Sequence, residues 1–185
     1  VGEYWDGNAN TVKAWIDATG KRSAAFDFAF RYAVRDAINQ NDWRVLNDTR
    51  LTGLNIDNGA YKQYAVTFVE NHDVQDRGTT SGYSPDPIRK DTLAANAYLL
   101  AMPGTPCVFY THYLAYPKEI KVMIDARKLA GVTNTSSYQV YRSSKDYYAN
   151  VVTGTNGKLL VVVGNNANQL TVLTSRYTKL LSGYH

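Results

Sequence analysis

The chain has 185 residues, of which 44% are hydrophobic and 19% are charged, with a formal net charge of +4. This composition is typical of a globular chain, and no apolar run is long enough to cross a membrane. The lysines and arginines are scattered along the sequence, which argues against a nucleic-acid partner, and the single cysteine, Cys107, excludes an internal disulfide.

The N-terminal segment pairs an apparent strand end with a carboxylate. Residues 1–7 read Val-Gly-Glu-Tyr-Trp-Asp-Gly, so Glu3 is followed by two aromatic residues and then by turn residues. A short helix is predicted over residues 10–18, because Thr19-Gly20 ends its pattern. Residues 23–28 are predicted to form a second strand, and Asp27 near its end is an additional carboxylate whose simplest role is structural.

The most informative segment covers residues 65–73, Ala-Val-Thr-Phe-Val-Glu-Asn-His-Asp. Its continuous apolar run favours a strand that is buried on both faces, as in parallel sheets. Polar groups at the carboxyl end of such a strand lie where α/β barrels place their active sites. Taken alone, His72 and Asp73 are also compatible with a strand-end cap and turn.

The segments on either side of this strand follow a helical pattern. Residues 32–38 are predicted to be helical, with Trp43, Leu46 and Leu51 as core contacts farther along. Residues 78–87 are a loop by composition, which in a barrel would border the substrate cleft.

The next helix is expected over residues 89–102, because Pro103-Gly104 stops it, and a strand over residues 105–110 with a buried Cys107 follows. Pro117 opens a further helix, for which we expect a solvent-exposed face that carries Lys118, Lys121, Arg127 and Lys128.

After residue 134 the pattern changes to short β runs. Strands are predicted over residues 138–141, 147–152 and 158–163, and Thr-Asn-Gly at residues 155–157 predicts a hairpin turn. A small antiparallel domain is therefore expected to begin here.

Three of these segments, in this order, resemble the α-amylase family of glycoside hydrolases, (β/α)8 barrel enzymes that cleave α-glucosidic bonds in starch-like glucans. They are residues 1–7, residues 68–73 and the helix, Pro-Gly and strand sequence of residues 99–110. The resemblance implies an α/β fold in which residues 1–134 form the C-terminal half of the (β/α)8 TIM barrel, about strands 5–8. Residues 135–185 would form part of an antiparallel β-sandwich domain.

The resemblance also implies roles for individual residues in an α-amylase-like, retaining cleavage of α-1,4-glucosidic bonds. Glu3 falls on the general acid/base, and Asp73 falls on the aspartate that stabilises the transition state. The nucleophilic aspartate of the family follows the fourth strand, which is not matched here. The candidates for substrate binding are His72, Trp5, Tyr4, Asn71 and Arg77.

Two observations leave alternatives open. Tyr4 and Trp5 offer aromatic faces for a sugar ring, but packing beside the strand end explains them equally well. Family members often have Tyr-Gly-Asp or Tyr-Gly-Glu after the eighth strand, whereas this chain has Tyr110-Thr111-His112, so no family role is carried over to His112. A non-catalytic carbohydrate-binding or transport-related relative of the same fold remains the alternative function.

A complete barrel takes roughly 250 residues, so we expect the chain to be a fragment that is truncated at both ends and inactive alone. Its expected partners are the missing N-terminal half of the barrel and an α-glucan polysaccharide or maltooligosaccharide. Calcium is common in the resembled family, but its ligands lie mostly in segments outside this chain, and no metal ligand is assigned. A polymeric substrate implies an extracellular or periplasmic location.

Overall fold

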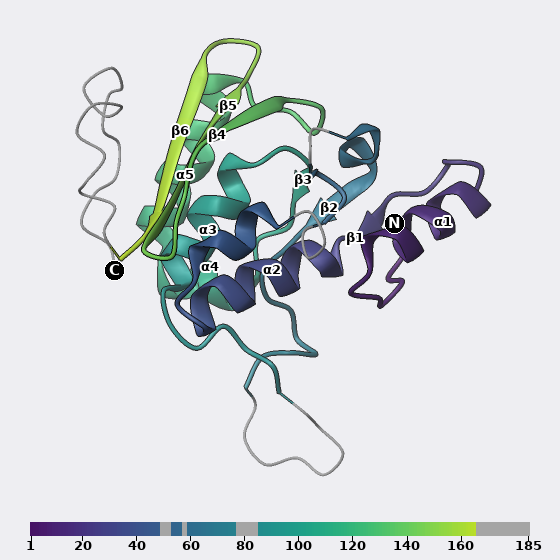
Figure 1. The fold of residues 1–185 in the computed structure, drawn as a ribbon, viewed down its shortest axis with the longest axis horizontal. Coiled ribbons are helices and arrows are strands. Elements are labelled where there is room, and N and C mark those ends of the chain that lie inside the picture. Colours follow the sequence, from purple (N-terminus) through teal and green to yellow (C-terminus); the bar gives the residue numbers. More distant parts are fainter. Residues whose placement is uncertain (49–52, 57–58, 77–84, 166–185) are drawn as a thin grey trace.

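A parallel sheet lies at the centre of the N-terminal part of the molecule (Figure 1). The computed structural model describes residues 1–48, 53–56, 59–76 and 85–165. The sheet has the order β1-β2-β3, with both pairs parallel, and Gly2 adds a parallel bridge to Ala25. Its strands are short: β1 (Ala25–Phe26), β2 (Ala65–Thr67) and β3 (Thr105–Pro106).

Helical segments connect these strands and cover them. In the described residues, the α-helices are α1 (Ala9–Ala18), α2 (Phe28–Asn39), α3 (Thr92–Ala101), α4 (Tyr110–Ala115) and α5 (Pro117–Ala130), and the 3-10 helices include η1 (Trp43–Asn47) and η3 (Ala60–Tyr64). Side chains define several helix starts: Asn8 accepts from the Asn10 N–H, and Asp27 accepts from the Phe30 N–H. Gly131 ends α5 in the left-handed conformation, with a φ of 69°.

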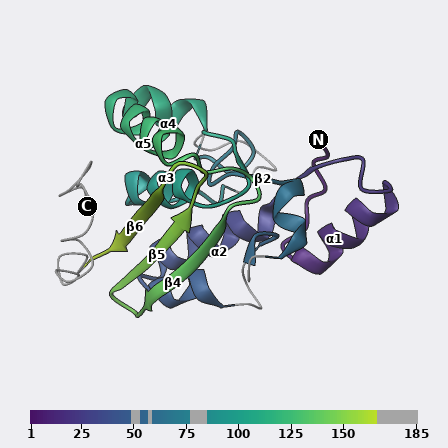
Figure 2. The ribbon, with the colours of Figure 1, turned by 90° about the horizontal axis from the view of Figure 1, so that it is seen from above.

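A second sheet, which is antiparallel, packs on the helices (Figure 2). Its strands are β4 (Ser137–Ser143), β5 (Tyr147–Thr153) and β6 (Lys158–Gly164), in the order β4-β5-β6. The central strand β5 is buried from Tyr147 to Val152. One hydrophobic core joins this sheet to α2, η1 and α3, through Val34, Ile38, Trp43, Leu46, Tyr98, Leu99, Met102, Tyr148, Val152 and Val163.

Most of the predicted elements are confirmed, with shifted ends. The helices expected over residues 10–18, 32–38 and 89–102 correspond to α1, α2 and α3, and the three β runs correspond to β4, β5 and β6. Trp43 and Leu46 are buried as expected, whereas Leu51, most of the loop over residues 78–87 and the chain after residue 165 lie outside the described residues. The domain boundary near residue 134 stays a prediction.

Two predicted strands are too long. The strand expected over residues 23–28 ends at Phe26, because the side chain of Asp27 caps α2 and Phe28 already belongs to that helix. The strand expected over residues 105–110 ends at Pro106, and Tyr110 begins α4. Helix formation therefore starts earlier than the apolar runs alone indicate.

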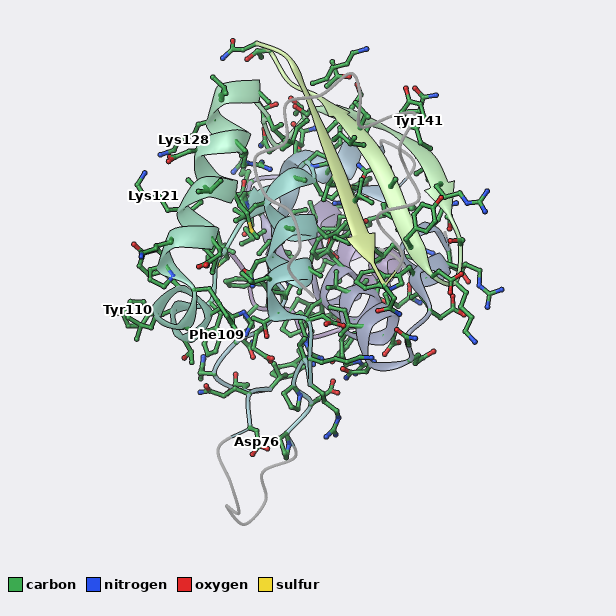
Figure 3. The ribbon with its side chains drawn as sticks, turned by 90° about the vertical axis from the view of Figure 1, so that its left-hand side faces the viewer. Asp76, Phe109, Tyr110, Lys121, Lys128 and Tyr141 are labelled. Atoms are coloured by element: carbon green, nitrogen blue, oxygen red, sulfur yellow. The ribbon has the colours of Figure 1, made fainter. Side chains whose placement is uncertain are left out.

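Two side chains differ from the prediction in their exposure to solvent. Lys121 and Lys128 point outward from α5 as expected (Figure 3), but Arg127 is only 9% exposed. Its guanidinium donates to the backbone carbonyls of Leu100, Met102 and Gly104 at 2.9, 2.6 and 2.8 Å. Cys107 is exposed instead of buried, because the strand that was expected to enclose it stops one residue earlier.

Gly131 offers a test of this packing. A Cβ at this position would lie 2.2 Å from Thr155 Oγ1, in the turn between β5 and β6, and the positive φ adds strain for any other residue. Gly131→Ala should therefore destabilise the full-length protein by about 1–3 kcal/mol, measured as a lower Tm by calorimetry. Gly157→Ala is the matched control, because a Cβ there meets nothing within 4 Å. Equal effects of the two substitutions would contradict the prediction.

Candidate active site

The parallel sheet brings the two candidate segments to one edge. The Gly2 N–H donates to Ala24 O at 2.8 Å, and the Phe26 N–H donates to Gly2 O at 3.0 Å, so the segment before Glu3 runs beside β1. On the other side of β1 lies β2, in parallel register. Since neighbouring strands are about 4.8 Å apart, the backbones of the two segments are separated by roughly 10 Å within the sheet. Glu3 and the residues after β2 therefore leave the same edge.

The segment after β2 changes from buried to exposed within a few residues. Phe68 and Val69 are buried, whereas the side chain of His72 is 71% exposed and that of Asp73 is 37% exposed. Asn71 shapes the turn, because its Oδ1 accepts from the N–H groups of Asp73 and Val74, both at 3.1 Å. His72 Nε2 lies 3.3 Å from Asp73 Oδ1. The predicted His-Asp pair is thus formed and faces solvent.

A series of aromatic contacts connects the segment that follows Glu3 to the segment that follows β2. Trp5 stacks on Phe28 with ring centroids 4.7 Å apart, and Phe28 meets Phe68 edge to face at 5.1 Å. The indole Nε1 of Trp5 donates to Tyr32 Oη at 2.8 Å. Tyr4 stacks instead on Trp15 of α1, at 6.0 Å. Both candidate aromatics use part of their surface for packing, yet Tyr4 is 37% exposed and Trp5 is 49% exposed.

The remaining candidates are placed as follows. Glu3 is exposed, and within the described part of the chain no hydrogen bond or ion pair joins it to Asp73. Arg77 lies outside the described residues. His112 is half-buried on α4, with Nδ1 3.2 Å from Asn96 Nδ2, and burial lowers its pKa to about 4. The site edge therefore offers two accessible carboxylates, suited to proton transfer and to hydrogen bonds with hydroxyl groups.

Two further carboxylates near this edge serve the backbone. Asp27 is fully buried and accepts from the N–H groups of Phe30 and Leu54 at 3.1 and 2.7 Å. Burial raises the pKa of Asp27 to about 6, although these two hydrogen bonds lower it. Glu70 is 4% exposed and accepts from the Ile88 N–H at 2.9 Å, and burial raises its pKa as well.

Two residues of α2 that contact the site segments were not predicted from the sequence. Arg31 is 0% exposed and contacts Glu70 and Asp86, while Tyr32 accepts from Trp5. The available signal was the helical spacing of Arg31 relative to Phe28, Val34 and Ile38, which puts a charged residue on the buried face of α2. A buried charge needs a partner, but the spacing does not name that partner.

Among the described residues, no group of three or more His, Cys, Asp or Glu side chains is placed to hold a metal ion. Within the same part of the chain, no helix is long and apolar enough to cross a membrane.

The sequence is similar to those of plant α-amylases. It is 32% identical over 171 residues to "Probable alpha-amylase 2" of Arabidopsis thaliana, which covers 82% of this chain and 40% of the relative. It is 35% identical over 108 residues to "Alpha-amylase type B isozyme" of Hordeum vulgare, which covers 57% of this chain and 66% of the relative. The chain thus spans less than two thirds of these relatives.

Among solved structures, a γ-CGTase from alkalophilic Bacillus clarkii matches with a TM-score of 0.65 and 22% identity, over 91% of this chain and 28% of that chain. At this identity the match shows the fold alone: the chain folds like part of a protein that combines a TIM barrel with a C-terminal domain. No protein-family model matches the chain.

The raised pKa of Asp27 predicts a pH dependence of stability. The folded state holds this proton more tightly than the unfolded chain, in which the carboxyl has the ordinary aspartate pKa of 3.8. Stability from this group is therefore fully present below pH 3.8 and is lost as the pH rises through about 6. Relative to Asp27→Asn, the wild-type protein should lose about 3 kcal/mol between these pH values, since one pKa unit corresponds to about 1.4 kcal/mol.

The measurement is the Tm of both proteins from pH 4 to pH 7, because their difference isolates Asp27. Asp42→Asn is the control: Arg44 lowers the pKa of Asp42 to about 2, so its contribution is lost only at lower pH and its difference should stay nearly constant in this range. A wild-type advantage over Asp27→Asn that grows with pH would refute the prediction.

Proposed function

The chain belongs to the α-amylase family of glycoside hydrolases, and on this basis we propose that the full-length protein hydrolyses α-1,4-glucosidic bonds of starch-like glucans with retention of configuration. The observation that carries the proposal is the pair of accessible carboxylates, Glu3 and Asp73, that leave one edge of a parallel sheet. The expected substrate is an α-glucan polysaccharide or a maltooligosaccharide.

In this proposal Glu3 is the general acid/base. A retaining glycosidase uses one carboxyl to protonate the leaving oxygen and a second carboxyl, about 5–5.5 Å away, as the nucleophile. Glu3 is exposed and within the described residues holds no hydrogen bond that would compete with a substrate oxygen. No residue of this chain is assigned as the nucleophile, which we expect from the rest of the protein.

Asp73 and His72 would act on the sugar that carries the reacting carbon. Asp73 would hydrogen-bond the sugar hydroxyls more strongly as the ring flattens towards the oxocarbenium-like transition state, which raises kcat. His72 Nε2, 3.3 Å from Asp73 Oδ1, would steady the same sugar. Asn71 supports both residues through its hydrogen bonds to the turn, and the exposed parts of Tyr4 and Trp5 are proposed to contact sugar rings.

The architecture and location follow the same proposal. The sheet Gly2-β1-β2-β3 would supply strands 5–8 of the barrel within residues 1–134, and residues 135–185 would begin the C-terminal β domain. Because the proposed substrate is a polymer, an extracellular or periplasmic location is expected. No step of the mechanism uses calcium.

The first test measures reducing ends released from soluble starch by the full-length protein, with product lengths analysed. Release of mixed maltooligosaccharides would support endo-acting cleavage, and a product of unchanged anomeric configuration would support retention. A full-length protein that binds maltooligosaccharides without releasing reducing ends would overturn the proposal in favour of a non-catalytic relative.

Glu3→Gln should lower kcat on starch by about 10²–10⁴-fold, because proton transfer to the leaving oxygen is lost. With an aryl glycoside, whose leaving group needs little protonation, the formation of the glycosyl-enzyme should be affected much less. Glu119→Gln on α5 is the matched control, because Glu119 lies in the first turn of that helix and has no proposed role. Starch hydrolysis by Glu3→Gln at the wild-type rate would exclude Glu3 as the acid.

A further inference from the structure

A buried arginine contacts two residues close to the candidate site, Glu70 and Asp86. Arg31, on α2, is 0% exposed, and its Nη1 donates to Asp86 Oδ2 at 2.5 Å. Its Nη2 donates to the backbone carbonyl of Asp86 and lies 3.7 Å from Glu70 Oε1. One guanidinium therefore hydrogen-bonds Asp86 through both Nη atoms and forms an ion pair with Glu70, which lies 16 positions earlier in the sequence.

Both partners of Arg31 are joined to the His72-Asp73 turn. Glu70 precedes this turn, and its Oε2 accepts from the Ile88 N–H at 2.9 Å. On the other side of the turn, Val74 O accepts from the Asp86 N–H at 2.9 Å. The turn is thus held at both ends by residues 86–88, and Arg31 holds those residues to α2.

The same stretch of α2 also reaches the Glu3 segment. Tyr32 Oη accepts from Trp5 Nε1 at 2.8 Å. The guanidinium carbons of Arg31 and Arg35 lie 5.3 and 4.8 Å from the centroid of the Tyr32 ring, within cation–π range. Consecutive residues of one helix therefore contact both segments that carry the proposed catalytic carboxylates.

We propose that Arg31 is a positioning residue, which through Glu70 and Asp86 sets the orientation of the His72-Asp73 turn relative to the Glu3 segment. This inference rests on the proposed glucan hydrolysis, and it assigns a role to residues that do not themselves touch substrate. Arg31 acts only through its neighbours, because it is completely buried.

Loss of Arg31 has a defined physical consequence. Without the guanidinium, Glu70 is a buried carboxylate with no cationic partner among the described residues, and the carboxylate of Asp86 keeps its ion pair with Arg35. Among the described residues, the contacts of residues 86–88 with α2 are then the Arg35–Asp86 ion pair and the hydrogen bond from Asn39 Nδ2 to Pro87 O at 3.2 Å. The link between α2 and Glu70 is lost, so the turn can shift. Because a displacement of about 1 Å can cost roughly 10²-fold in rate, Arg31→Met should lower kcat by about that factor with a smaller change in KM.

Two arginine variants separate positioning from stability. Arg35→Met also removes a contact with Asp86 but leaves the contact between Arg31 and Glu70 intact, so its loss of kcat should be smaller. Arg127→Met removes another buried arginine, which donates only to carbonyls of residues 100–104, away from the proposed site. It should lower Tm and leave the kcat of the folded enzyme unchanged.

The experiment measures kcat, KM and Tm of the full-length protein and of these variants on a maltooligosaccharide, together with hydrogen exchange at the Asp86 and Ile88 amides. We expect Arg31→Met to lower kcat selectively and to speed exchange at both amides. Arg31→Met/Glu70→Gln removes the unpaired charge and should regain Tm without regaining kcat. If Arg31→Met does not fold, Arg31→Lys takes its place in the experiment. Arg31→Lys keeps the positive charge but loses the paired donors of the guanidinium, so we expect it to lower kcat partially.

Wild-type kcat in folded Arg31→Met or Arg31→Lys, or full recovery of kcat in the double variant, would overturn the positioning role while glucan hydrolysis stands. A wild-type protein without hydrolytic activity would instead reject the proposed function, and with it the catalytic meaning of Arg31. Selective loss of kcat in Arg31→Met beside unchanged kcat in Arg127→Met would support the inference.

Discussion

The candidate site depends on the parallel hydrogen bonding of Gly2, β1, β2 and β3. β1 has only two residues, yet its neighbours bond to it on both sides: the Phe26 N–H donates to Gly2 O, and the Asp27 N–H donates to Val66 O. Parallel strands need crossover connections, and their carboxyl ends meet at one edge. The short ladder is therefore enough to bring Glu3 and the turn with His72 and Asp73 to the same side of the sheet.

Helix α2 turns this backbone arrangement into a rigid support. Val34 and Ile38 belong to the core that α2 shares with the antiparallel sheet, while Phe28 and Arg31 contact the segments that carry the candidate site. The helix α2 packs against η1 and α3, which in turn pack against the antiparallel sheet, and α2 thereby holds the site edge. The antiparallel sheet, which was predicted to belong to a separate domain, therefore contributes to the hydrophobic core that supports the site.

Local pattern explains what could be predicted, and distant contacts explain the rest. The apolar run before Glu70 and the helix stop at Pro103-Gly104 follow from residue order, so the sequence predicts them. The buried Arg127 depends on three carbonyls that lie more than 20 positions away in the sequence, which no helical period reports. The buried position of Arg31 could not be predicted for the same reason, because Glu70 and Asp86 come close to it only in the folded chain.

The carboxyl groups at the site edge divide by how fully their oxygens are occupied. Asp27 and Glu70 are buried and accept from backbone N–H groups, so their hydrogen-bonding capacity is spent on holding the chain. Glu3 and Asp73 remain accessible, and Asp73 has an ionisable neighbour in His72. A group that must exchange a proton or hydrogen-bond a sugar needs free lone pairs. This division is the physical reason to propose Glu3 as the general acid/base and Asp73 as the carboxylate that stabilises the transition state, and not their buried neighbours.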